Sequence, residues 1–197
     1  MTLVNRVKNI LLTPRQEWEL IDGESTTVGA LYTGYIMPLA AIGPIAQVIG
    51  YSVFGITLPL AGTYRTPIGS AITGGIVSYG LTLVGIYVLG LVIDGLAPTF
   101  GGTKNSIQAL KVAAYSGTAG WLAGIFALLP GLRLLGILGL YSLYLLYLGL
   151  PRLMKSPAEK ALGYTVVVIL VAVVLFMLIG AVAGRFIAGP PMGMMGR

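Results

Sequence analysis

Five long stretches of this chain contain no charged residue. Its 197 residues include only 12 Lys or Arg and 6 Asp or Glu. A helix needs roughly 17–25 mostly apolar residues to cross the hydrocarbon core of a membrane. Each stretch is therefore long enough to hold a membrane-spanning helix. The uncharged stretches are residues 25–64, 66–93, 112–132, 134–151 and 161–184.

The composition of the chain argues against a water-soluble fold. Hydrophobic residues make up 56% of the chain and charged residues only 9%, whereas about 25% of residues are charged in soluble domains. We therefore predict an all-α fold, a polytopic transmembrane bundle whose main partner is the lipid bilayer. Residues 54–67 are expected to form a loop or a re-entrant segment rather than a sixth span, because Pro59 and Gly62 interrupt them. The five predicted spans are residues 28–52, 69–92, 110–130, 132–150 and 161–183.

The distribution of positive charge predicts the orientation of the spans. With five crossings, eight of the 12 Lys and Arg residues fall on the N-terminal side of the membrane and four on the other side. Because basic residues accumulate on the cytoplasmic side, we expect the N-terminus in the cytoplasm and the C-terminus outside. This predicts a cytoplasmic amphipathic segment at residues 1–24, a single transmembrane domain at 25–184 and a flexible extracytoplasmic tail at 185–197.

The N-terminal segment has the pattern of an amphipathic helix. Its apolar residues recur on one helical face, which is typical of a helix that lies in the lipid headgroup region. Thr13-Pro14 then predicts the start of a second helix, with Thr13 as its cap, because Pro favours the first helical position. Trp18 on that helix suits the membrane interface, and a docking site for a cytoplasmic partner is the alternative function of the segment. The apolar face comprises Leu3, Val4, Val7, Ile10 and Leu11, and the polar face Asn5, Arg6, Lys8 and Asn9.

Glycine is unusually frequent, with 29 residues in the chain. Small residues four positions apart lie on one helical face and let two membrane helices approach closely. We expect these faces to pack within the molecule, with self-association through the last span as the alternative. Leu129-Pro130-Gly131 predicts a tight antiparallel hairpin between the third and fourth spans. The four-residue spacings are Ser70, Gly74 and Ser78; Gly120 and Gly124; and Gly180 and Gly184.

Two prolines interrupt the first predicted span. Pro38 and Pro44 each remove a backbone donor, so we expect a kink in this helix. Interrupted helices line binding sites in many transporters. Both prolines are therefore candidate functional residues, with a purely structural kink as the simpler interpretation.

Tyrosines supply a second group of candidate site residues. Tyr141, Tyr144 and Tyr147 recur every three residues along the fourth predicted span. One hypothesis is a polar seam or small cavity that they form with Tyr115, Ser116 and Thr118 of the neighbouring span. The alternative is an aromatic belt at the cytoplasmic interface.

No Asp, Glu, Lys or Arg falls in the middle of a predicted span, and this absence argues against a path for ions or protons. Asp94 and Lys111 lie near the ends of the second and third spans. Because an acid at a helix C-terminus opposes the helix dipole, we expect Asp94 to pair with Lys104 or Lys111. Such a pair is either an interfacial structural contact or a gating or partner-binding site.

Two residue types that carry much of enzyme chemistry are missing, since the chain has no Cys and no His. Their absence excludes thiol nucleophiles, imidazole metal ligands and Ser/His relays. An enzyme is therefore the least expected class, and we predict no cofactor and no metal site. The basic residues do not cluster into a patch for nucleic acid.

Four groups of residues follow one another in a characteristic order along residues 8–184. Their order resembles the Yip family of Ypt/Rab-interacting membrane proteins and its bacterial relatives. The resemblance implies five spans and a cytoplasmic N-terminus. The groups are Pro14, Trp18, Ile21 and Glu24; Gly101-Gly102 with Ser106, Gln108 and Ala114-Tyr115-Ser116; Leu138-Gly139-Leu140-Tyr141 through Leu150-Pro151; and Ser156-Pro157-Ala158-Glu159-Lys160-Ala161, which has the form of a capping box.

In eukaryotes the family is linked to Rab-type GTPases and vesicle traffic. The resemblance therefore implies a GTPase partner and a Golgi or ER membrane for a eukaryotic member. This chain lacks the long cytoplasmic segment and the Asp-Leu-Tyr-Gly-Pro motif of those relatives, and it has Ala119 where they have a proline. We therefore expect a bacterial-type member in the cytoplasmic (inner) membrane.

Two functional hypotheses follow from the sequence. The first is a non-enzymatic membrane organiser that binds other membrane proteins, or a second copy of itself, through its glycine-rich helix faces. The second is a small-solute or ion permease with a site between the kinked first span and the tyrosines of the fourth span. Lipid binding or scrambling is the remaining alternative.

Overall fold

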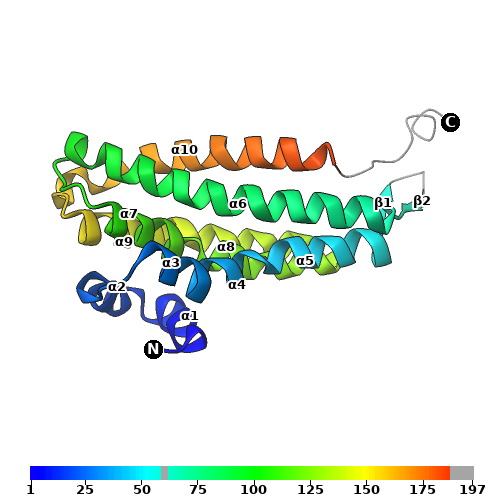
Figure 1. Cartoon of the computed structure of the whole chain (residues 1–197), viewed down its shortest axis with the longest axis horizontal. Coiled ribbons are helices and arrows are strands. Elements are labelled where there is room, and N and C mark those ends of the chain that lie inside the picture. The colour runs from blue at the N-terminus through cyan, green and yellow to red at the C-terminus, as the bar shows by residue number, and fades with distance from the viewer. Residues whose placement is uncertain (59–61, 187–197) are drawn as a thin grey trace.

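The protein is an elongated helical bundle, seen in a computed structural model that describes residues 1–58 and 62–186. Figure 1 shows the long helices side by side along the longest axis. Among these described residues, four helical segments are long and apolar enough to cross a membrane. The predicted helical transmembrane bundle is thus confirmed, while the predicted number of five spans is not. The four candidate spans are Val28–Phe54, Ile68–Phe100, Gly131–Met154 and Ala158–Gly184.

Two short helices precede the first span and lie against the side of the bundle near one end (Figure 1). They are α1 (Leu3–Leu12) and α2 (Pro14–Gly23). Most of the apolar face of α1 packs on the protein core, with Ile10 fully buried, whereas Val4 is 73% exposed. The expectation that this face meets lipid headgroups stays a prediction, whereas the placement of Arg6 on the polar face is wrong, because Arg6 is buried. Trp18 of α2 is also buried in protein and does not face the membrane interface.

The first candidate span changes its helix type repeatedly. It breaks at Ala41, between the two prolines, and the carbonyl of Met37 accepts the hydroxyl of Tyr79 from a neighbouring helix at 3.2 Å. A neighbouring hydroxyl thus supplies a donor where the helix is interrupted. The interruption predicted from Pro38 and Pro44 is confirmed. The segments are α3 (Val28–Leu31), the π-helix η1 (Tyr32–Ile36), α4 (Met37–Ala40), α5 (Ile42–Ile49) and the π-helix η2 (Gly50–Phe54).

A small antiparallel hairpin connects the first two candidate spans. Strand β1 (Ile56–Leu58) pairs with β2 (Gly62–Tyr64), and Ile56 lies opposite Tyr64. Residues 59–61 lie outside the described part of the chain, as do residues 187–197 of the predicted tail. Where the structure describes it, the segment predicted as a loop or a re-entrant turn is a β-hairpin at one end of the bundle (Figure 1).

The longest helices, α6 (Ile68–Leu96) and α10 (Ala158–Gly184), pack side by side. Gly85 of α6 allows a close approach, since a Cβ there would lie 2.6 Å from Cδ1 of Ile179. The buried hydroxyl of Tyr164 on α10 donates to the carbonyl of Ile93 on α6. After α6 the chain forms the 3₁₀ helix η3 (Ala97–Phe100).

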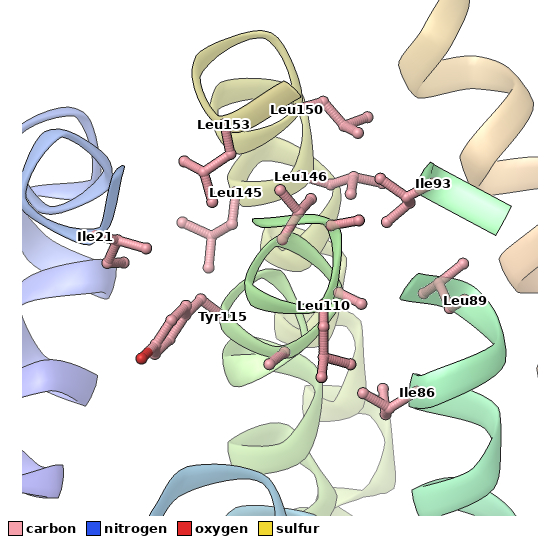
Figure 2. Close-up of a cluster of buried hydrophobic side chains, with 14 of the residues drawn as sticks. Ile21, Ile86, Leu89, Ile93, Leu110, Tyr115, Leu145, Leu146, Leu150 and Leu153 are labelled. Atoms are coloured by element: carbon pink, nitrogen blue, oxygen red, sulfur yellow. The ribbon is translucent and has the colours of Figure 1, made fainter. Parts of the chain in front are cut away.

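Helix α7 (Ser106–Ser116) lies at the centre of one end of the bundle. Every residue from 109 to 116 is buried, which is the pattern of a helix covered on all sides. Figure 2 shows Leu89 and Ile93 of α6 on one side of α7 and Ile21 of α2 on the other. Leu145 and Leu150 of α9 (Tyr141–Met154) belong to the same cluster.

The chain continues from α7 into a helical hairpin. Helix α8 (Thr118–Ala123) and the 3₁₀ helix η4 (Gly124–Leu128) lead to the turn, and the 3₁₀ helix η5 (Pro130–Leu140) returns beside them into α9. Gly139 packs on Gly120, with its added Cβ 3.3 Å from the Gly120 Cα. The predicted antiparallel hairpin is therefore confirmed. The predicted span 110–130 is not a continuous helix, because it is broken at Gly117 and tightens to 3₁₀ at Gly124.

Glycines in this hairpin also contact the first span. A Cβ on Gly124 would lie 2.8 Å from the Cα of Gly43. The spacing of Gly120 and Gly124 therefore serves packing within the molecule, as predicted.

Two predicted helix caps do not form. The N-cap of α10 is Pro157, with no side-chain cap bond, and the buried Oγ of Ser156 has no hydrogen-bond partner in the described part of the chain. Thr13 donates to the carbonyl of Asn9 at 3.1 Å and does not cap α2. Pro14 does occupy the first position of α2, as predicted.

We predict that Gly124→Ala destabilises the bundle by about 1–3 kcal/mol, because the new methyl group would overlap the backbone of Gly43. Gly136→Ala in the neighbouring 3₁₀ helix is the matched control, since no atom in the described part of the chain lies within 4 Å of a Cβ there. Thermal unfolding of the detergent-purified variants, followed by circular dichroism, compares the two. Equal melting temperatures would contradict this close backbone contact.

Candidate functional site

A buried ion-pair network fastens the N-terminal helices to each other. Arg6 of α1 places Nη1 2.5 Å from Oε1 of Glu17 and Nη2 2.5 Å from Oε1 of Glu24. The Arg6 and Glu17 side chains are only 8% and 2% exposed. Burial lowers the pKa of Arg6, but the hydrogen bond and charge of Glu24 outweigh this effect and raise that pKa above its ordinary value. Arg6 therefore stays charged inside the protein.

Lys111 joins the central helix α7 to the end of α2. Its Nζ donates to the carbonyl of Ile21 at 2.8 Å and to the carbonyl of Glu24. These are carbonyls at the C-terminal end of α2, where a helix leaves acceptors unpaired and favours a cation. Gln108, one turn earlier on α7, donates Nε2 to the carbonyl of Asp22 at 3.0 Å. Both side chains therefore cap α2 from the transmembrane bundle.

Trp18 adds apolar contacts between α2 and the transmembrane bundle. Its indole lies so close to Gly149 of α9 that a Cβ there would come within 2.6 Å of Cζ2. The edge of the ring meets Tyr115 of α7, with centroids 6.2 Å apart and ring planes at 83°. The indole Nε1 is buried without a hydrogen-bond partner in the described part of the chain. Only glycine at position 149 leaves room for this tryptophan.

Further aromatic contacts connect Tyr115 to the first candidate span. Tyr115 packs on Tyr35 with ring centroids 4.6 Å apart, and the Tyr35 hydroxyl lies 2.7 Å from Oγ1 of Thr118. The guanidinium carbon of Arg6 lies 5.6 Å from the centre of the Tyr115 ring. A cavity of about 320 Å³ adjoins these groups and is lined by Arg6, Tyr35, Lys111 and Tyr115, among others. We call the set Arg6, Glu17, Trp18, Glu24, Lys111 and Tyr115 the N-terminal junction.

The structure brings together only some of the predicted site residues. Lys111 and Tyr115 both belong to the N-terminal junction, whereas Ser116 bonds its own helix through the carbonyl of Val112 at 2.6 Å. Asp94 does not pair with Lys104 or Lys111. Its Oδ1 accepts the backbone N–H of Asn105 at 2.7 Å instead.

The three tyrosines of α9 lie elsewhere. Tyr141, Tyr144 and Tyr147 are 36%, 40% and 42% exposed on the surface of the bundle. Tyr141 donates its hydroxyl to the carbonyl of Leu11 at 3.0 Å. The polar seam predicted between these tyrosines and Tyr115 and Ser116 is therefore wrong.

The prolines of the first span are separate from these tyrosines. Pro44 lines an apolar cavity of about 380 Å³ between α5 and α6, and Tyr147 lines a different cavity beside α2. The described structure does not place Pro38 and Pro44 in a shared site with Tyr141, Tyr144 and Tyr147.

Comparison with known proteins places residues 8–179 in the Yip1 domain. The chain belongs to the Yip1 domain family. The chain is 25% identical over 127 residues to "Inner membrane protein YohC" of Escherichia coli K12, and equally to the protein of that name in Escherichia coli O6:H1 strain CFT073. The match covers 64% of this chain and 65% of each relative. No solved structure matches the chain.

Several residues that carry the resemblance to the Yip family meet at the N-terminal junction. Trp18, Glu24 and Tyr115 are members of it, and Ile21 supplies one of the carbonyls that Lys111 binds. The motifs that are far apart in the sequence thus form one structural unit.

Sequence reasoning missed Arg6 and Glu17, although a signal was present. In α2, Glu17 lies between Pro14, Trp18 and Ile21, which recur at helical spacing and are all buried. An acid inside an apolar stripe indicates a buried cationic partner. Arg6 lies in the same way between Leu3, Val7 and Ile10 of α1.

We predict that Arg6→Gln weakens the docking of α1 and α2 by about 3–5 kcal/mol, because Glu17 is left buried without its cation. Faster amide hydrogen exchange in residues 3–23, measured by mass spectrometry, is the expected result. Lys8→Gln on the exposed side of α1 is the control.

The double variant Arg6→Gln/Glu17→Gln separates the ion pair from general damage. It removes both charges, so it should exchange more slowly than Arg6→Gln alone. Exchange in Arg6→Gln that matches the Lys8→Gln control would show that the ion pair does not hold these helices.

Proposed function

We propose that this Yip1-domain protein is a non-enzymatic protein of the bacterial inner membrane that associates with a second copy of itself through α10. We further propose that it crosses the membrane five times, with its N-terminus in the cytoplasm and its C-terminus outside. The observation that carries the proposal is the contrast between glycines that pack inside the bundle and the unpacked pair Gly180 and Gly184 on α10.

The path of residues 106–128 supports a fifth crossing. Helix α7 begins beside the end of α6, and η4 packs on α5 and η5 towards the other end of the bundle. At 1.5 Å per α-helical residue and 2.0 Å per 3₁₀ residue, this segment is roughly 35 Å long, which exceeds the hydrocarbon thickness of about 30 Å.

Reporter fusions test the topology. We expect alkaline phosphatase to be active only when fused after residue 186 and green fluorescent protein to fluoresce only when fused before residue 1, because five crossings place the two ends on opposite sides. A fusion after residue 103 should behave as cytoplasmic. Activity of both end fusions in the same compartment would contradict five crossings.

The surface of α10 supports self-association. Of its most apolar stretch only 11% is buried, against 22–28% in the other candidate spans. Met177 is 68% exposed, and no atom of the described residues lies within 4 Å of a Cβ on Gly180 or Gly184. In lipid, helices associate through close packing of small residues, because lipid tails are as apolar as the side chains. This face therefore suits a second α10.

The permease hypothesis has less support. In the four candidate spans, Asp, Glu, Lys and Arg occur only near the ends. The cavities lined by Pro44 and by Trp121 within the spans are both almost entirely apolar. Neither cavity offers the polar lining that a path for solutes or ions needs.

We predict that Met177→Cys forms a disulfide-linked dimer when membranes are oxidised. The chain has no native Cys, so the background is zero. Adding Gly180→Leu or Gly184→Leu should reduce the cross-linked fraction at least about fivefold, because the larger side chains keep the helices apart. Non-reducing gel electrophoresis measures this fraction.

The controls lie on α6. Val84→Cys is similarly exposed at 60%, and Gly80 also has nothing within 4 Å of an added Cβ. Val84→Cys should cross-link weakly, and Gly80→Leu should not affect the Met177→Cys dimer. Equal cross-linking from both helices would refute association through α10.

A further inference from the structure

A second cavity adjoins Trp18 of the N-terminal junction and lies between α2, α9 and α10. Its volume is about 390 Å³, within the range of roughly 300–1,000 Å³ found for ligand sites. Apolar side chains line it together with two arginines and one carboxylate, that of Glu19. The lining includes Arg15 and Trp18 of α2, Leu148, Pro151 and Arg152 of α9, and Ala161 of α10.

The cavity lies where two candidate spans end. Arg152 is in the last turn of α9, which ends at Met154, and Ala158, also in the lining, is the first residue of α10. Tyr147, one turn deeper on α9, lines the same cavity. This is the depth at which lipid headgroups meet the ends of membrane helices and where tyrosine is enriched.

The charged side chains around the cavity have an excess of positive charge. Arg15 is exposed and forms no ion pair in the described part of the chain. Arg152 lies 3.5 Å from Glu19 and 3.6 Å from Asp22, and Asp22 is itself bound by Lys155 at 2.5 Å. Arg152 is still 47% exposed. Both guanidinium groups can therefore bind a further anion.

An unsatisfied donor adds to these cations. Trp18 lines the cavity, is only 1% exposed, and its Nε1 has no hydrogen-bond partner among the described residues. A buried N–H without an acceptor costs roughly 1–3 kcal/mol. A ligand acceptor that reached Nε1 would remove that cost.

We propose that this cavity binds an anionic phospholipid. The phosphodiester group contacts Arg15 and Arg152, and one acyl chain follows the apolar lining of Leu148 and Ala161 towards the membrane interior. Basic pockets between membrane helices are known to select anionic headgroups, because cation and phosphate attract strongly at the low-dielectric interface. The site is separate from the exposed face of α10 and does not depend on self-association.

The test uses the full chain in nanodiscs that contain equal amounts of phosphatidylglycerol and phosphatidylcholine. Native mass spectrometry after gentle release measures which lipid stays bound. We expect phosphatidylglycerol to be retained preferentially, and Arg15→Gln/Arg152→Gln to reduce this preference roughly 20-fold. The charge-matched control is Lys8→Gln/Lys104→Gln, which removes two exposed cations that do not line the cavity and should preserve the preference.

A second variant tests the apolar part without removing charge. Ala158→Phe places a ring at the cavity wall and should lower lipid retention while α1 and α2 keep their wild-type hydrogen exchange. An excess of soluble glycerol phosphate should not displace the lipid. Unchanged retention in Arg15→Gln/Arg152→Gln, an equal loss in the lysine control, or displacement by glycerol phosphate would each overturn the proposal.

Discussion

A helix that is buried on all sides must be covered on all sides, and this requirement shapes one end of the molecule. The transmembrane helices α6 and α9 cover two sides of α7. The remaining surface carries Lys111 and Tyr115, which lipid could not satisfy with hydrogen bonds. Helices α1 and α2 cover it, and the carbonyl groups at the end of α2 receive the lysine. The N-terminal segment is therefore part of the transmembrane fold and not an appendage to it.

The position of the charges could be predicted from the sequence, but the partner of each charge could not. Uncharged stretches located four of the spans, with every boundary within four residues except the end of the second span, which was predicted at residue 92 and lies at Phe100. Length and hydropathy alone decide whether a helix can cross lipid. The third predicted span does not meet the length criterion for a continuous helix, because Gly117 and Gly124 divide it into short helices of different type. The hairpin that contains it was still predicted, because Leu129-Pro130-Gly131 strongly favours a turn.

The candidate site was harder to predict, for a physical reason. Helical periodicity shows that one face of α1 is apolar, but lipid and protein are equally suitable neighbours for such a face. Only Arg6 within that face distinguishes the two, because a buried guanidinium needs carboxylates, and these come from positions 17 and 24. The tyrosines of α9 were misplaced for a related reason. Three-residue spacing shows that they share a side, and not that this side faces inwards.

The variety of helix types in the bundle has a consequence for how the protein matches the thickness of its membrane. The first candidate span takes 27 residues and contains two π-helices, whereas the segment from Gly131 to Met154 takes 24 residues and begins with residues 131–140 of a 3₁₀ helix. The wide turns of a π-helix advance less per residue and the narrow turns of a 3₁₀ helix advance more. Unequal numbers of amino acids can therefore reach similar depths, so the winding of each segment, as well as its residue count, adjusts its length to the bilayer.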